Sequence, residues 1–300
     1  MGAPVSIKTL TTICSRRGRE GEVANLLGFA SDMYSQNGED GIVARVFSII
    51  GPGQRRCCEY GAWDGMHLSN TRALIENGWS GALIECDEAR FNRLRRNTRL
   101  FPTVAAIKAR VDAADNRLSV LLKRCGVPLE LDFLSIDVDG LDYDLLLALD
   151  DIRPRLICVE VNAGHHPASF AIIPRQVAAN NVGQPLSAFV SAADKLGYRL
   201  ICYTGNAFFL RQDEGRGPEL PTLTPQDAYT GFLRAMPPSE RRWLHLVNLG
   251  LVSPYYSFQN SLLTSSAYKL SRLGIARARM RYLAMKGRRS VAGIVGARRV

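Results

Sequence analysis

Short apolar runs, typical of buried strands, alternate with stretches of helical apolar spacing along the middle of the chain. Most connections between these runs are too long for hairpins, which predicts parallel strand pairing. The last connection differs, because the turn at Gly205-Asn206 has hairpin spacing and predicts an antiparallel final strand. Strands are predicted up to Glu59-Tyr60 and at 81–86, 104–108, 131–138, 155–161, 198–203 and 207–211, and helices at 42–50, 71–77, 88–98, 118–125, 143–149 and 185–196.

This alternation predicts an α/β fold with one doubly wound, mostly parallel sheet and a terminal antiparallel strand. We expect it over residues 34–211, after an N-terminal extension over 1–33. A C-terminal extension with a helical, basic tail is expected over 212–300. Residues 164–183 are too irregular for a helix and too long for a plain connection, which favours a lid or a substrate loop.

Acidic residues stand at the carboxyl ends of four predicted strands: Glu59, Glu85, Asp137 and Glu160. In an open parallel sheet these ends form one rim, and ligands bind at that rim. The pattern therefore predicts a ligand site built around these carboxylates.

The stretch C-C-E-Y-G-A-W-D-G, residues 57–65, runs from a strand into a glycine-containing turn. Gly61 and Gly65 leave the backbone accessible to a cofactor, and the helix that follows supplies amide donors. Glu85, at the tip of the next strand, stands where such sheets bind a ribose diol. The alternative interpretation is an ordinary β-turn-α unit with solvated acids.

The net charge of +10 is concentrated at the C-terminus. From Leu251 onward there are ten Lys or Arg and no Asp or Glu, while the preceding residues hold 28 basic and 28 acidic side chains. One interpretation is a cationic amphipathic helix on an anionic membrane surface. The other is a solvated tail that binds nucleic acid through charge alone, or nothing. Few aromatic residues interleave with the cations, so specific nucleic-acid recognition is not expected.

The remaining composition indicates a globular intracellular protein, 46% hydrophobic and 22% charged. Its seven cysteines show no metal-type spacing, which favours reduced, packed thiols. No apolar run reaches transmembrane length, and no signal peptide is recognisable at the N-terminus. We therefore expect a cytoplasmic protein, peripheral to the inner face of the membrane if the tail binds lipid.

Six motifs carry a likeness to a known family: S-Q-N-G-E-D-G (35–41), E-Y-G-A-W-D-G (59–65), L-I-E-C-D (83–87), F-L-S-I-D-V-D-G-L-D-Y (133–143), C-V-E-V-N (158–162) and G-Y-R-L-I-C-Y-T-G-N-A-F-F-L (197–210). Together they resemble the FkbM-like group of Rossmann-like class I S-adenosylmethionine-dependent methyltransferases. The resemblance implies a Rossmann-like fold and S-adenosylmethionine as the cofactor.

The resemblance also implies roles for individual residues. Glu59 and the loop with Gly61, Ala62 and Gly65 would hold the amino-acid part of the cofactor. Glu85 would bind the ribose hydroxyls, Asp112 would lie near the adenine, and Asp137 would stand at the reacting end. The family's Asp-Val-Glu-Gly-x-Glu is Asp-Val-Asp-Gly-Leu-Asp in this chain, so two of its acids are one methylene shorter.

Methylation of a hydroxyl needs a base or a metal ion to remove its proton. The candidate catalytic residues are Asp137 and His165; His166 is less suited, because Pro167 constrains its backbone. Asp137, Asp139 and Glu160 could instead bind Mg²⁺ or another hard divalent cation. Both histidines could equally line a surface loop.

The expected function is O-methylation of a sugar, a glycan or a secondary metabolite. One alternative is a non-catalytic protein that binds the cofactor or acts as a scaffold in glycan assembly. Another is an NAD-dependent oxidoreductase, which the absence of a G-x-G-x-x-G turn after the first strand disfavours.

Overall fold

The structure is a computed structural model that describes residues 26–112, 116–138, 140–149, 151–161, 183–215 and 219–236. The described residues up to Ala235 belong to one compact unit. Its strands are β1 Arg56–Tyr60, β2 Ser80–Glu85, β3 Val104–Lys108, β4 Phe133–Ile136, β5 Leu156–Glu160, β6 Tyr198–Tyr203 and β7 Asn206–Arg211. Its helices are η1 Leu26–Phe29, α2 Glu39–Ile50, α3 Arg72–Glu76, α4 Glu88–Asn97, α5 Leu118–Arg124, α6 Asp142–Leu147, α8 Leu186–Lys195 and α9 Pro225–Ala235.

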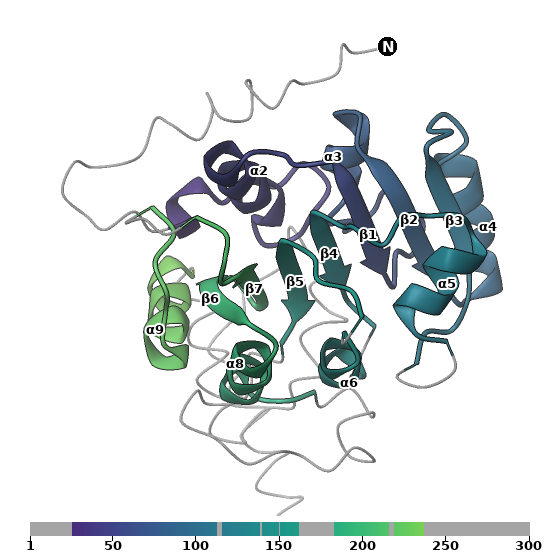
Figure 1. Ribbon diagram of the computed structural model, residues 1–300. Coiled ribbons are helices and arrows are strands. Elements are labelled where there is room, and N and C mark those ends of the chain that lie inside the picture. The colour runs from purple at the N-terminus through teal and green to yellow at the C-terminus, as the bar shows by residue number, and fades with distance from the viewer. Residues whose placement is uncertain are drawn as a thin grey trace, which may run out of the picture. The chain divides into compact units, whose positions relative to one another are not determined.

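The strands form one sheet in the order β3-β2-β1-β4-β5-β7-β6 (Figure 1). The pairs from β3 to β5 are parallel. β7 is antiparallel to both of its neighbours, because the hairpin from β6 places it between β6 and β5. The predicted α/β fold is therefore confirmed, and its antiparallel strand lies one position inside the edge of the sheet.

Helices cover both faces of the sheet. On one face, α2, α3 and α4 bury a hydrophobic cluster against alternate strand residues, among them Cys57, Leu83 and Phe133. Helices α5, α6 and α8 lie on the opposite face (Figure 1). Each of these three helices has an apolar side chain that is almost fully buried: Leu122 of α5, Leu146 of α6 and Phe189 of α8. The sheet thus forms the middle of three layers, and its carboxyl rim is left between helices.

Predicted and observed elements agree within one to three residues at their ends. The helix α9 was not predicted from the sequence. It packs on β6, where the rings of Tyr203 and Phe232 meet edge to face at a centroid distance of 5.0 Å. Residues 1–25 of the predicted extension over 1–33, the predicted lid up to residue 182 and the basic tail lie outside the described residues.

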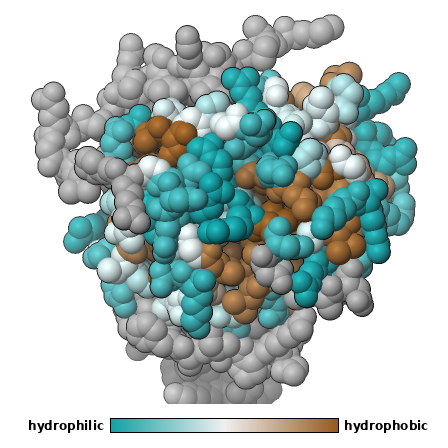
Figure 2. Space-filling model, in the orientation of Figure 1, coloured by the Kyte–Doolittle hydropathy of each residue, from teal (hydrophilic) through white to brown (hydrophobic). Residues whose placement is uncertain are grey.

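No helix in the described part of the chain is long and apolar enough to cross a membrane. Cys57, Cys58, Cys158 and Cys202 are buried free thiols, while Cys86 and Cys125 are exposed. Burial raises the pKa of the Cys202 thiol to about 12, so this thiol stays protonated near neutral pH. On the face seen in Figure 2, hydrophobic residues gather near the centre and hydrophilic ones surround them.

Candidate functional site

The four predicted acids lie at the same rim and on the same face of the sheet. β1, β2, β4 and β5 are parallel neighbours or near neighbours, so their carboxyl ends meet. Side chains alternate along a strand, and the residues two positions before Glu59 and Glu85 belong to the core cluster beneath α2–α4. The same holds for Glu160, which follows Cys158 by two. The side chains of the acids at the rim thus point towards the layer of helices that contains α2, α3 and α4.

The turn after β1 is closed by its own backbone. The amide of Ala62 donates to the carbonyl of Ile84 at 3.0 Å, and the amide of Gly65 donates to the carbonyl of Ala62 at 2.7 Å. Gly61 and Gly65 both have a φ of +69°, a left-handed conformation that favours glycine. This turn holds the end of β1 against the end of β2.

A Cβ atom would be obstructed at both Gly61 and Gly65, but by different neighbours. Gly61 is exposed, and a Cβ there would overlap with the backbone carbonyl of Asp137. Gly65 is buried, and its Cβ would meet Leu94 and Leu83. Gly65 therefore allows the loop to pack on α4, whereas Gly61 brings the end of β1 close to the end of β4. Their predicted contact with a cofactor stays a prediction.

Glu59 is buried, and its carboxylate holds the start of α3. Ser69 Oγ and Thr71 Oγ1 each donate to Oε2 at 2.7 Å, and the amide of Asn70 donates to Oε1 at 2.8 Å. Burial raises the pKa of Glu59, and these three donors act in the opposite direction. Ser69 Oγ also accepts from the amide of Arg72, the first residue of α3, at 3.1 Å. Through these hydrogen bonds the buried Glu59 fixes the conformation of the connection between β1 and α3.

Glu85 lies between the β1 loop and the start of α4. Its Oε2 accepts from the amide of Trp63 at 3.0 Å, and its Oε1 accepts from the amide of Asp87 at 2.7 Å. The Trp63 ring, at a residue with a φ of +47°, lies under the guanidinium of Arg90, 4.4 Å from the ring centroid. Glu85 is buried, with 4% exposure, and because a carboxylate oxygen can accept more than one hydrogen bond, its two amide donors leave acceptor capacity unused.

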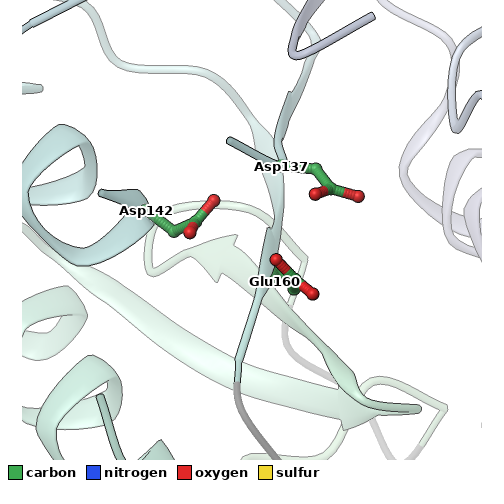
Figure 3. Close-up of side chains that lie close together, drawn as sticks. All are labelled: Asp137, Asp142 and Glu160. Carbon is green, nitrogen blue, oxygen red and sulfur yellow. The ribbon is translucent and has the colours of Figure 1, made fainter. Parts of the chain in front are cut away.

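The end of β4 brings together an acidic cluster that the sequence predicted in part. Oxygens of Asp137, Asp142 and Glu160 lie within 4.8 Å of one another. They come from the end of β4, the start of α6 and the end of β5, as Figure 3 shows. Asp142 is buried and accepts from the amides of Val138 and Gly140, at 2.8 and 3.0 Å. Three carboxylates at this spacing fit a hard divalent cation.

Sequence reasoning did not select Asp142 for this cluster. Its signal was the D-V-D-G-L-D run itself, in which the last acid begins α6 and turns back towards the rim. Asp139 and His165, the other predicted metal and catalytic candidates, lie outside the described residues. Asp112 follows β3, where its Oδ1 accepts from the amide of Asn116 at 3.0 Å.

A second loop, residues 33–38, stands at the rim beside the β6–β7 turn. Asp40 Oδ2 accepts from the amides of three successive residues, 33–35, at 2.7 to 2.9 Å. Glu39 Oε2 accepts from the amides of Gln36 and Asn37, and its Oε1 accepts from Thr204 and Asn206. Ser35 Oγ accepts from the amide of Asp40, in the first turn of α2, at 3.1 Å. The S-Q-N-G-E-D-G motif thus builds a rigid loop with exposed Gln36 and Asn37 side chains.

A cavity of about 650 Å³ lies at the opposite rim, next to the amino ends of β4 and β5. Arg155, which lines it, pairs with Glu214 through Nε and Nη2, both at 2.8 Å, and with Asp132 at 3.3 Å. Arg211 is likewise bound to Asp213 and Glu214. These ion pairs tie the C-terminal strands to the sheet. The charges at this cavity are therefore structural, and we place the candidate site at the acidic rim.

No family model matches the chain, and no curated protein matches its sequence. Solved structures do match. A TehB-like SAM-dependent methyltransferase from Corynebacterium glutamicum shares 13% identity over 60% of this chain and 89% of its own, with a TM-score of 0.38. An O-methyltransferase from Bacillus cereus, solved with SAH, shares 13% over 70% and 93%, with a TM-score of 0.37. Precorrin-6y C5,15-methyltransferase from Geobacter metallireducens shares 13% over 61% and 92%, with a TM-score of 0.36.

Proposed function

We propose that this protein is an S-adenosylmethionine-dependent methyltransferase of the FkbM-like kind that methylates a hydroxyl of a sugar, a glycan or a secondary metabolite. The observation that carries the proposal is the rim itself. Four acids at the ends of β1, β2, β4 and β5 face one side of a sheet with the order 3-2-1-4-5-7-6. Ligands of open α/β sheets bind at this edge.

The cofactor would occupy the rim between the β1 loop and β2. Glu85 supports this assignment, because it is held by two backbone amides and retains capacity to accept from ribose hydroxyls. Gly61 is exposed at the turn, so its main chain is accessible to a ligand. When bound, S-adenosylmethionine supplies an electrophilic methyl group on a sulfonium.

The acceptor would lie nearer β4 and β5, where Asp137 and Glu160 stand. A carboxylate there can accept the proton of the acceptor hydroxyl. Alternatively, Asp137, Asp142 and Glu160 could hold a divalent cation, with Asp142 added to the ligands predicted from the sequence. The oxygen-only donor set fits Mg²⁺. In either case the chain's role is to bind, to orient and to remove a proton.

Titration calorimetry with S-adenosylhomocysteine, and with NAD as the comparison ligand, tests the cofactor assignment. We expect binding of the first and none of the second. Turnover is then measured on a panel of nucleotide sugars, glycans and phenolic metabolites by release of S-adenosylhomocysteine. Binding without turnover on any panel member would favour the non-catalytic alternative, and binding of NAD alone would overturn the proposal.

A further inference from the structure

The first half of the sheet carries a concentration of positive charge on helix α4 and the residues after it. Residues 89–111 hold seven cations and no acid: Arg90, Arg93, Arg95, Arg96, Arg99, Lys108 and Arg110. The chain before Leu251 is neutral as a whole. This segment therefore carries a local excess of positive charge, which acidic residues elsewhere before Leu251 balance.

Four of these cations have no counter-ion among the described residues. Arg93, Arg95, Arg96 and Arg99 are exposed, and in the described part of the chain none of them forms an ion pair. We call these four residues the α4 basic surface. The acids at the start of α4 are engaged elsewhere, since Asp87 caps the helix and Glu88 pairs with Lys108. The α4 basic surface is thus available to an external anion.

Two of these arginines are neighbours on the helix. Arg93 and Arg96 are three residues apart within α4, which ends at Asn97, whereas Arg99 lies two residues beyond its end. Like charges at a spacing of three residues are neighbours on a helix and repel each other. An anionic partner that lies across this pair removes that repulsion.

An exposed apolar residue adjoins the same segment. Leu100, directly after Arg99, is 85% exposed, the highest value among the exposed large hydrophobic residues of the described chain. Cations next to an exposed Leu match a lipid interface, where guanidinium groups contact phosphates and the apolar chain enters the acyl boundary. A nucleic-acid surface would favour an aromatic side chain at this place.

We propose that the α4 basic surface, with Leu100, docks the domain on an anionic lipid bilayer. This surface belongs to the folded domain and is separate in sequence from the basic residues after Leu251. The inference does not depend on the reaction proposed above. It assigns the lipid contact to named side chains at the β3 edge of the sheet, where α4 packs on β2 and β3 (Figure 1).

The test is sedimentation of the full-length protein with vesicles of phosphatidylcholine alone and of phosphatidylcholine with one third phosphatidylglycerol. We expect binding to the anionic vesicles only. Arg93→Glu/Arg96→Glu should lower the partition coefficient at least about tenfold, since each cation near such a surface contributes about a fivefold factor. Leu100→Ser should lower it about fivefold at moderate salt, where the apolar contribution remains.

Lys123→Glu/Arg124→Glu is the matched control, because it makes the same change in net charge at two exposed positions of α5. It should lower binding less than about threefold. Circular dichroism confirms that each variant is folded. An equal loss in both double variants, or no loss in either, would overturn the proposal and point to net charge or to another part of the chain. Tighter binding to single-stranded polyuridylate than to anionic vesicles would also overturn it, in favour of a nucleic-acid partner.

Discussion

Glu85 accepts a hydrogen bond from the backbone amide of Trp63 at 3.0 Å, which joins the tip of β2 to the loop that follows β1. The two segments are 22 residues apart in the chain and together form one side of the proposed cofactor site. A ligand at this side would meet a carboxylate whose orientation is already set by two amides, so little ordering remains for binding to supply.

Glu85→Gln tests this assignment. The change keeps the size of the side chain and removes its charge, so the charge-assisted bonds to two ribose hydroxyls are weakened. We expect a loss of about 1–3 kcal/mol in the free energy of binding of S-adenosylhomocysteine. Glu88→Gln, at an exposed position nearby, should leave the affinity unchanged. Wild-type affinity in the Glu85 variant would remove the ribose assignment.

Gly61→Ala tests the close approach of β1 to β4. A Cβ at Gly61 would overlap with the carbonyl of Asp137, whereas Gly126, at nearly the same φ, has open space around its Cβ position. Gly126→Ala should cost about 1–2 kcal/mol of unfolding free energy for the left-handed conformation alone. Gly61→Ala should cost about 2 kcal/mol more, because the backbone must shift. Urea denaturation measures both, and equal costs would contradict the packing described above.

Asp137→Asn tests the chemistry at the end of β4. If Asp137 accepts the acceptor's proton, kcat should fall about 10²–10⁴-fold with near-normal cofactor affinity. Glu130→Gln, at the opposite rim, is the control and should keep wild-type turnover. Treatment with EDTA separates the two roles, since only a metal site loses activity that Mg²⁺ restores. Wild-type kcat in the Asp137 variant would exclude both.

Glu39 should make the stability of the protein depend on pH. Its burial raises its pKa above the ordinary 4.5, so the folded state binds this proton more tightly than the unfolded state. The stabilisation is complete below pH 4.5 and is lost as the pH rises through the folded pKa. Relative to Glu39→Gln, the wild type should therefore lose unfolding free energy over that interval. A wild type that gains stability relative to the variant would contradict the assignment.

Arg155 should matter for stability and not for the proposed site. Its side chain is 16% exposed and pairs with Glu214 and Asp132, which are 13% and 4% exposed. Arg155→Met leaves these carboxylates without their cation and should cost about 3 kcal/mol of unfolding free energy. Arg45→Met, which breaks a more exposed pair with Glu219, should cost less than about 1 kcal/mol. Both variants should bind S-adenosylhomocysteine like the wild type.

The order of helices and strands could be predicted from the sequence, because apolar periodicity is a local property. β3 was predicted at its observed bounds, and the acids at the ends of β1, β2, β4 and β5 were placed from strand boundaries alone. Parallel pairing followed from the lengths of the connections. Helix α9 was missed although its start carries a local signal, because Thr224 Oγ1 accepts from the amide of Asp227 and Pro225 stands at the first helical position.

Only the tertiary structure decided which way the predicted residues face and what they contact. Glu59 and Glu85 looked alike in sequence, yet Glu59 is enclosed by Ser69, Asn70 and Thr71, while Glu85 bridges two loops. Asp142 joined the acidic cluster because the start of α6 folds back on the β4 end. The contacts of Glu59 with the start of α3 and of Glu85 with Trp63 join residues that are brought together by packing of the sheet, so no local pattern records them, whereas Asp142 had a local signal in the D-V-D-G-L-D run. The sequence by itself determined the periodicity and the candidate acids, and the packing of the chain determined their partners.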